Sequence, residues 1–128
     1  MSISVLLVND TLSVIHKLEA MLSAEGVRVV GTSATIAAAT ADLQRTLPDI
    51  VVIDANLGRE TGFDLCRSVK IRHPNTFVAM VSYEHSDLTR HIAYHCGSDF
   101  FIPKPIAGST VQAMVSAYQW ARRNPRSI

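Results

Sequence analysis

A buried strand is predicted by the stretch Ile50-Val51-Val52-Ile53, which Asp54 follows directly. Four consecutive β-branched residues suit a strand of a parallel sheet, because such strands are covered on both faces and need not alternate with polar residues. Three other runs are also nearly continuous in apolarity: residues 5–8, 77–81 and 100–102. A further run at residues 27–30 is interrupted by Arg28, so we expect it to lie at the edge of the sheet.

Between these runs the apolar residues recur with the period of a helix, which predicts five helices. Their apolar markers are Leu12, Ile15, Leu18 and Leu22; Ile36, Ala39, Leu43 and Leu47; Phe63, Cys66 and Val69; Leu88 and Ile92; and Val111, Met114, Val115 and Tyr118. Gly26 stands where a left-handed residue commonly ends a helix, and Pro48 ends the second helix. Strands that alternate with helices predict an α/β fold, a doubly wound sheet of five parallel strands with helices on both faces.

The length of 128 residues fits one domain, which we expect to span residues 1–122, with 123–128 as a loose tail or the stub of a linker. Apolar residues make up 48% and charged residues 18%, which is typical of a globular protein and not of a disordered one. Twelve Lys and Arg residues nearly balance eleven Asp and Glu residues. This balance argues against electrostatic attraction of the whole chain to nucleic acid or to an anionic membrane.

The sequence also predicts where the protein works. No apolar run approaches the ~18 residues that a membrane span needs, and no charged segment precedes the first apolar stretch as in a signal peptide. The two cysteines, Cys66 and Cys96, lack the C-x-x-C spacing and are too few for a disulfide framework. We therefore expect a cytoplasmic protein with both thiols reduced.

Polar residues follow four of the five apolar runs. In an open α/β sheet, ligands bind beyond the carboxyl ends of the strands, so these residues are the candidates for a functional site. They are Asn9 and Asp10, Asp54 and Asn56, Ser82 and Glu84, and Lys104 between Pro103 and Pro105. We expect their side chains to converge at one edge of the sheet.

The chemistry of this set points to phosphoryl groups. Carboxylates beside an amide or carbonyl suit Mg²⁺, and the Lys104 ammonium and Ser82 hydroxyl suit phosphoryl oxygens. A carboxylate such as Asp54 can itself attack phosphorus, and a cation offsets the repulsion between two anions. A single Asp after a strand is more often a cap or a turn former, but suitable residues at four strand ends favour a site.

These residues resemble the receiver domain of two-component response regulators over essentially the whole chain. The resemblance is carried by Asn9-Asp10, Ile53-Asp54-Ala55-Asn56, Val81-Ser82 and the stretch GSDFFIPKP at 97–105. It implies a flavodoxin-like fold with strand order 2-1-3-4-5. It also implies a signalling protein and not an enzyme: a phosphorelay switch that takes a phosphoryl group from a sensor histidine kinase or a phosphotransfer protein.

The resemblance assigns the phosphoacceptor and the metal site. Asp54 would accept the phosphoryl group, and Mg²⁺ would be held by Asp10, Asp54 and the backbone carbonyl of Asn56. The family has two acidic residues where this chain has Asn9-Asp10. Asn9 would reach the metal only through water, which should weaken Mg²⁺ binding without abolishing it. This loss leaves open a second interpretation, a receiver-like protein-interaction module with weak or no phosphorylation.

The resemblance also assigns the switch. Ser82 and Lys104 would contact the phosphoryl group, and Ser82 and Phe101 would change conformation with it. Phe101 lacks the hydroxyl of the commoner Tyr, so an inward ring gains no hydrogen bond, although switching by packing stays possible. Gly58 replaces a common proline, which should loosen residues 57–60. Gly62 matches the glycine that usually opens the third helix.

The expected output surface is formed by the helix around residues 88–92, the strand at 100–102 and the helix at 111–118, and would contact an output partner or domain. Homodimerisation is left open. We expect no direct nucleic-acid binding, because Arg122, Arg123 and Arg126 have no interleaved aromatic residues and no helix-turn-helix follows them. His91 and His95 are spaced for a metal beside Cys96, but lack a further ligand nearby.

Two other functions are less well supported. A haloacid-dehalogenase-type phosphatase would need a general acid two residues after its nucleophile, where this chain has Asn56. A flavin-binding flavodoxin-like protein would need a loop rich in Ser, Thr and Gly after the first strand. That loop is the acidic, glycine-free Asn9-Asp10-Thr11-Leu12.

Overall fold

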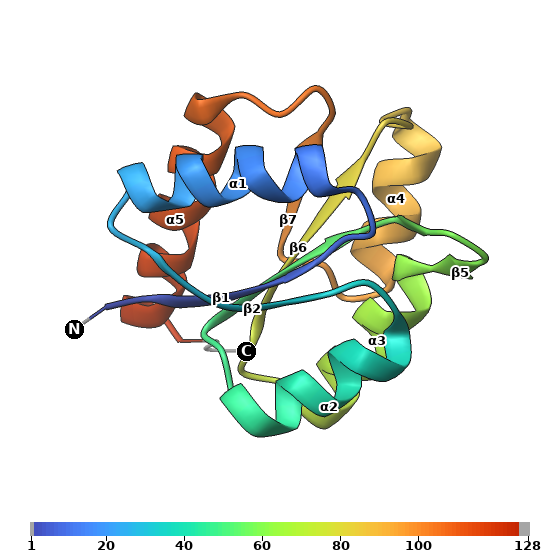
Figure 1. Cartoon of the computed structure of the whole chain (residues 1–128), viewed down its shortest axis with the longest axis horizontal. Coiled ribbons are helices and arrows are strands. Elements are labelled where there is room, and N and C mark those ends of the chain that lie inside the picture. The colour runs from blue at the N-terminus through green and yellow to red at the C-terminus, as the bar shows by residue number, and fades with distance from the viewer. Residues whose placement is uncertain (1, 126–128) are drawn as a thin grey trace.

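Five parallel strands form one sheet in the computed structural model, which describes residues 2–125. The strands are β1 (Ser4–Val8), β2 (Arg28–Ser33), β3 (Ile50–Asp54), β6 (Phe77–Ser82) and β7 (Phe100–Pro103). Their order is β2-β1-β3-β6-β7 (Figure 1), which is 2-1-3-4-5 when these five strands are counted along the chain. The predicted topology is therefore confirmed, as is the edge position of β2, the strand that contains Arg28.

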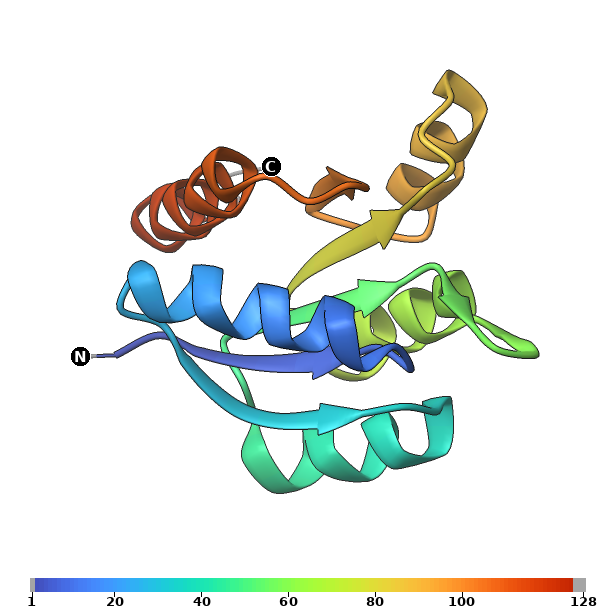
Figure 2. The ribbon, with the colours of Figure 1, turned by 45° about the horizontal axis from the view of Figure 1, so that its top comes forward.

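Five helices cover the two faces of this sheet. They are α1 (Leu12–Ala24), α2 (Ile36–Thr46), α3 (Gly62–Arg72), α4 (Asp87–His95) and α5 (Gly108–Arg123). Helices α1 and α5 lie on one face, and α2, α3 and α4 lie on the other (Figure 2). Helix α5 continues through Arg123, the first residue of the expected tail, and residues 126–128 lie outside the described part. No helix within residues 2–125 is long and apolar enough to cross a membrane.

Residues 5–8 of β1 and residues 50–53 of β3 are all apolar, because both faces of these central strands are buried. Every residue of β1 and β3 is buried. Leu7 and Val52 pack toward α1 and α5, whereas their chain neighbours Leu6 and Val51 pack toward α2, α3 and α4. The side chains alternate between two cores, so polar residues are excluded until the strand ends at Asp54.

Helix α4 differs from the prediction. Leu88 and Ile92 were expected to mark its inner face, but their side chains are 68% and 40% exposed. The buried positions are Ala93 within the helix and Cys96 at its end. That prediction is wrong because two small side chains, one turn apart, make the contact with the core, and this leaves the larger apolar side chains on the outer face.

The segment after β3 forms a short antiparallel hairpin that the sequence did not predict. Strands β4 (Asn56–Leu57) and β5 (Glu60–Thr61) pair across a turn at Gly58, whose φ is +64°. A proline cannot adopt this φ, so Gly58 suits this turn, whereas the proline that the resemblance implies at this position would not. The Glu60 carboxylate accepts a hydrogen bond from the backbone N–H of Ile36 at 2.9 Å, which ties the hairpin to the start of α2.

Candidate functional site

The carboxyl ends of the parallel strands meet at one edge of the sheet, and Asp54 lies at the centre of that edge. Asp54 is the last residue of β3, and Ser82 is the last residue of the neighbouring β6. Both are buried, at 2% and 6% exposure. Lys104 directly follows β7 and is also buried, and its backbone N–H donates to the carbonyl of Ser82 at 2.9 Å. The strand-end residues therefore converge as the sequence predicted.

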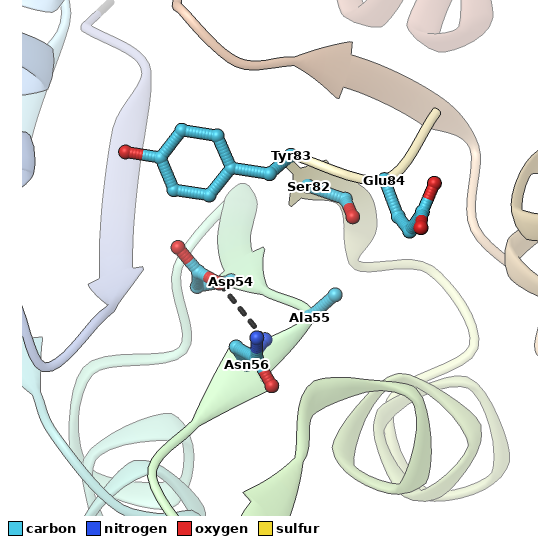
Figure 3. Close-up of a pocket in the computed structure, with 6 residues that line it drawn as sticks. All are labelled: Asp54, Ala55, Asn56, Ser82, Tyr83 and Glu84. Carbon is cyan, nitrogen blue, oxygen red and sulfur yellow. Dashed lines mark hydrogen bonds between the residues drawn. The ribbon is translucent and has the colours of Figure 1, made fainter. Parts of the chain in front are cut away.

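Three donors surround the Asp54 carboxylate. Its Oδ2 accepts from the Asn9 Nδ2 at 3.0 Å and from the Lys104 ammonium, with which Asp54 also forms a buried ion pair. Its Oδ1 accepts from the backbone N–H of Asn56 at 2.8 Å, drawn as a dashed line in Figure 3. A carboxylate this deeply buried needs such partners, since an unpaired charge away from water is costly by several kcal/mol.

Asn9 is held in one orientation by its own loop. Its Oδ1 accepts from the backbone N–H of Thr11 at 2.9 Å, a turn that Asn and Asp side chains favour. This contact directs the Nδ2 group toward Asp54, and the residue is only 2% exposed. An aspartate at position 9 could accept the hydrogen bond from the Thr11 N–H but could not donate one to Asp54. The direct bond to Asp54 was not predicted, because only a role through water was expected.

Asp10 lies on the exposed side of the same loop. Its Oδ1 accepts from the Thr11 hydroxyl at 3.2 Å, and a Cβ built on Gly58 would lie 3.7 Å from its Oδ2. The β4–β5 turn therefore passes close to the Asp10 carboxylate. A side chain at position 58 would therefore lie against the Asp10 carboxylate.

The oxygen atoms here suit a hard cation. Two carboxylates, of Asp10 and Asp54, and the backbone carbonyl of Asn56 are the donor types that Mg²⁺ takes when it keeps several of its waters. Within residues 2–125 no group of three or more His, Cys, Asp or Glu residues is placed to hold a metal. These donor types fit a Mg²⁺ ion that keeps part of its hydration shell.

An open pocket of about 270 Å³ lies beside Asp54 (Figure 3). Its walls are Asp54, Ala55, Asn56, Ser82, Tyr83 and Glu84. Since a water molecule takes about 30 Å³ in the liquid, the pocket accommodates a group of phosphoryl size together with waters. Every polar residue of this lining except Tyr83 was predicted as a site candidate from its place after a strand. Tyr83 directly follows Ser82, so the same strand-end rule could have predicted it as a site candidate too.

Phe101 does not line this pocket. It is half-buried on β7 and packs against the core beneath α2, α3 and α4. The Arg90 guanidinium of α4 lies 4.7 Å from the centre of its ring, and the Arg90 Nε donates to the carbonyl of His85 at 3.3 Å. Arg90 thus links the loop after β6 to the outer side of Phe101.

Within residues 2–125, the histidines of α4 and the two cysteines form no group of three or more that could hold a metal. The rings of His91 and His95 meet edge to face, with their centres 4.2 Å apart. Cys96 is buried and its Sγ accepts from Arg67 at 3.3 Å, while the Cys66 thiol donates to the carbonyl of Cys96 at 3.4 Å. Burial raises the pKa of the Cys66 thiol to about 12, so this thiol stays protonated at neutral pH.

The model of the response regulator receiver domain family matches residues 5–116 of the chain. The chain belongs to this family. Receiver domains are signalling domains of two-component systems, so the fold and the family predicted from the strand-end residues are both confirmed.

Individual relatives agree with this assignment. The receiver domain is 27% identical over 114 residues to the transcriptional regulatory protein AfsQ1 of Streptomyces coelicolor, covering 89% of this chain and 50% of that protein. It is 30% identical over 116 residues to the sensory transduction protein RegX3 of Mycolicibacterium smegmatis, covering 89% and 49%. The chain thus spans about half the length of these curated relatives.

A solved structure supports the fold. The CheX-CheY-BeF3-Mg²⁺ complex of Borrelia burgdorferi matches with a TM-score of 0.84 at 22% identity, covering 90% of this receiver domain and 87% of that chain. At this identity the likeness concerns the fold alone.

Proposed function

We propose that this receiver domain is a phosphorylation-controlled switch of a two-component phosphorelay, which accepts a phosphoryl group on Asp54 from a histidine kinase or a phosphotransfer protein. The observation that carries the proposal is the Asp54 carboxylate, buried at the end of β3 with Lys104 on Oδ2 and an open pocket beside it. The domain would catalyse only its own phosphotransfer and slow dephosphorylation. We expect it to act in the cytoplasm.

The chemistry follows from the groups around Asp54. One carboxylate oxygen forms a bond to phosphorus while the bond from phosphorus to the donor nitrogen breaks, and the electron pair of that bond stays on the nitrogen. The Lys104 ammonium would pair with a phosphoryl oxygen and the Ser82 hydroxyl would donate to another, which stabilises the charge that gathers there. Bound Mg²⁺, with Asp10, Asp54 and the Asn56 carbonyl as its protein ligands, would supply further positive charge.

Intact-mass measurement tests the proposal directly. The protein is incubated with Mg²⁺ and a small phosphodonor, such as acetyl phosphate or phosphoramidate. We expect a gain of one phosphoryl group that is stable in acid and is released by hydroxylamine, as an acyl phosphate is. A phosphoryl group that resists hydroxylamine, or that is attached to histidine, would contradict a role for a carboxylate.

A second candidate function is a receiver-like interaction module that is phosphorylated weakly or not at all. The hydrogen bond that Asn9 donates to Asp54 favours this second function. The Asn9 amide occupies one oxygen of the Asp54 carboxylate and adds no negative charge that could attract a metal ion. Unchanged mass after prolonged incubation with phosphodonor and Mg²⁺, in a protein that still binds its output partner, would favour this function over the first.

Replacing Asn9 with aspartate should tighten Mg²⁺ binding and destabilise the metal-free protein. A third carboxylate near the cation adds electrostatic attraction, but desolvation and repulsion from Asp54 offset most of it. We therefore expect the free energy of Mg²⁺ binding to become more favourable by about 0.5–2 kcal/mol. Without metal the variant loses the donor to Asp54 and places two carboxylates together, which should cost about 1–3 kcal/mol of unfolding free energy. Mg²⁺ titration by amide shifts, and urea unfolding with and without Mg²⁺, measure the two effects.

The matched control for this change is Asn75→Asp. Asn75 is exposed in the loop before β6, at the opposite end of that strand from Ser82, so the same change of charge there should leave Mg²⁺ affinity unaltered. If Asn9→Asp and wild type bind Mg²⁺ equally well, position 9 does not act on the metal.

We expect partners to recognise the phosphorylated state at the face that α4, β7 and α5 form. Ser82 and Phe101 lie on neighbouring strands, β6 and β7, and Leu88 and Ile92 offer exposed apolar surface for an output partner or a second copy. We expect beryllofluoride with Mg²⁺ to shift amide resonances across this face. The coupling free energy between phosphorylation and binding at this face should be about 1–3 kcal/mol. Shifts restricted to the neighbourhood of Asn9 and Asp10 would contradict this prediction.

A further inference from the structure

Two histidines lie one turn apart on the outer face of α4. The rings of His91 and His95 have their centres 4.2 Å apart, and both residues are exposed. Ala93 and Cys96 turn another face of the helix to the core, which leaves the histidines directed to solvent. Figure 2 shows α4 at the periphery of the molecule, so a ligand can reach this face directly.

Neither imidazole is committed to another partner. Within residues 2–125, the side-chain hydrogen bonds of α4 and its cap are made by Ser86, Thr89 and Arg90. A neutral imidazole keeps a lone pair on one ring nitrogen, and in an exposed side chain that nitrogen is available to a ligand. The helix therefore offers two nitrogen donors on adjacent turns.

The end of α4 holds His95 in place. The Ser98 N–H donates to the Ala93 carbonyl at 3.1 Å. The Gly97 N–H donates to the Tyr94 carbonyl at 2.9 Å, and Gly97 has a left-handed φ of +95°. These two bonds close the last turn in the pattern that commonly ends helices. A fixed last turn keeps the two imidazoles side by side, and the partial negative charge at the carbonyl end of a helix favours a cation there.

We propose that His91 and His95 together bind a transition-metal ion, Zn²⁺, Ni²⁺ or Cu²⁺, through one ring nitrogen each. A Zn–N bond is about 2.0–2.1 Å long, so two nitrogens on one ion lie about 4 Å apart or less. Rings whose centres are 4.2 Å apart can turn to meet that distance. Within residues 2–125 no group of three or more His, Cys, Asp or Glu residues includes them. Water would therefore fill the remaining positions, which stay open to a ligand from another molecule.

The chemistry of the donors separates this site from the one beside Asp54. Imidazole suits Zn²⁺, Ni²⁺ and Cu²⁺, and Cu²⁺ should bind most tightly of the three. Mg²⁺ takes oxygen ligands instead and should not compete. Binding at α4 does not require phosphorylation, so it does not rest on the proposed function. Since α4 belongs to the expected output surface, the ion would add positive charge and an open coordination position to that surface.

Zinc titration of the full chain tests the proposal. The chain has five histidines, and at pH 7.5 an ordinary imidazole is mostly neutral. We expect Zn²⁺ to shift the ring resonances of His91 and His95 and to leave those of His16 unchanged. Calorimetry should give one ion per chain, bound about tenfold or more weakly in His91→Ala and in His95→Ala, because the second donor acts at high effective concentration. The matched control is His16→Ala, since His16 is exposed on α1 with no histidine one turn away.

Two results would overturn the proposal. One is equal Zn²⁺ affinity in wild type and His91→Ala. The other is reversal of the Zn²⁺ shifts by millimolar Mg²⁺, which would place the ion at the oxygen atoms of Asp10 and Asp54. Thermal unfolding adds a readout that depends on the helix, because only folded α4 holds both imidazoles together. Zn²⁺ should raise the unfolding midpoint of the wild type but not that of the double variant His91→Ala/His95→Ala, and an equal rise in both would also contradict the site.

Discussion

Replacing Asp54 with asparagine is expected to abolish phosphorylation by small-molecule donors. The amide oxygen of asparagine is a poor nucleophile, and its NH₂ group cannot accept the hydrogen bonds that Asp54 accepts from Asn9, Lys104 and the Asn56 N–H. We expect intact mass to show no added phosphoryl group under conditions that label the wild type fully. Circular dichroism checks that the variant is folded, since Lys104 loses its buried partner.

The control for this change is Asp64→Asn. Asp64 is an exposed carboxylate in the first turn of α3, and its ion pair with Arg67 lies on the surface, so the variant should be phosphorylated like the wild type. Reduction of the acyl phosphate with borohydride converts the modified aspartate into homoserine and locates it in the wild type directly. Homoserine at any position other than 54, or label that persists in Asp54→Asn, would contradict the assignment.

The sheet could be predicted from the sequence because its central strands are buried on both faces. Residues of β1 and β3 have no solvent-facing side, so their apolar runs stop only where the strands end. The first polar residue after each run then marks the same edge of the sheet, which is how Asn9, Asp54 and Lys104 could be grouped before any contact between them was known.

Features that depend on side-chain direction could not be predicted in this way. Leu88 and Ile92 have the spacing expected of the buried face of a helix. Only the burial of Ala93 shows that α4 turns a different face to the core and leaves Leu88 and Ile92 exposed. The bond from Asn9 to Asp54 depends on the turn that fixes the amide, and the position of the Tyr83 ring depends on its rotamer. These are tertiary contacts, on which periodicity carries no information.

Replacing Gly62 with alanine should destabilise the fold strongly. Gly62 is the first residue of α3, and a Cβ there would lie 2.0 Å from the backbone oxygen of Asp54 and 2.9 Å from the Cγ2 of Ile53. The obstructing oxygen belongs to the central strand, so α3 must shift away or the end of β3 must move. We expect a loss of about 2–4 kcal/mol of unfolding free energy, in the upper range for overpacking. Urea unfolding followed by circular dichroism measures it.

Gly108→Ala is the matched control for that measurement, because Gly108 is also the first residue of a helix, α5, and a Cβ there has no neighbour within 4 Å. Neither glycine has a left-handed φ, so alanine at position 108 should be neutral or stabilising by up to about 1 kcal/mol. If the two variants unfold at the same urea concentration, α3 adjusts without cost and the close approach does not constrain the fold. If Gly62→Ala is the less stable variant, we also expect it to be phosphorylated more slowly than Gly108→Ala, because the backbone oxygen that the new Cβ would displace belongs to Asp54, the proposed phosphoacceptor.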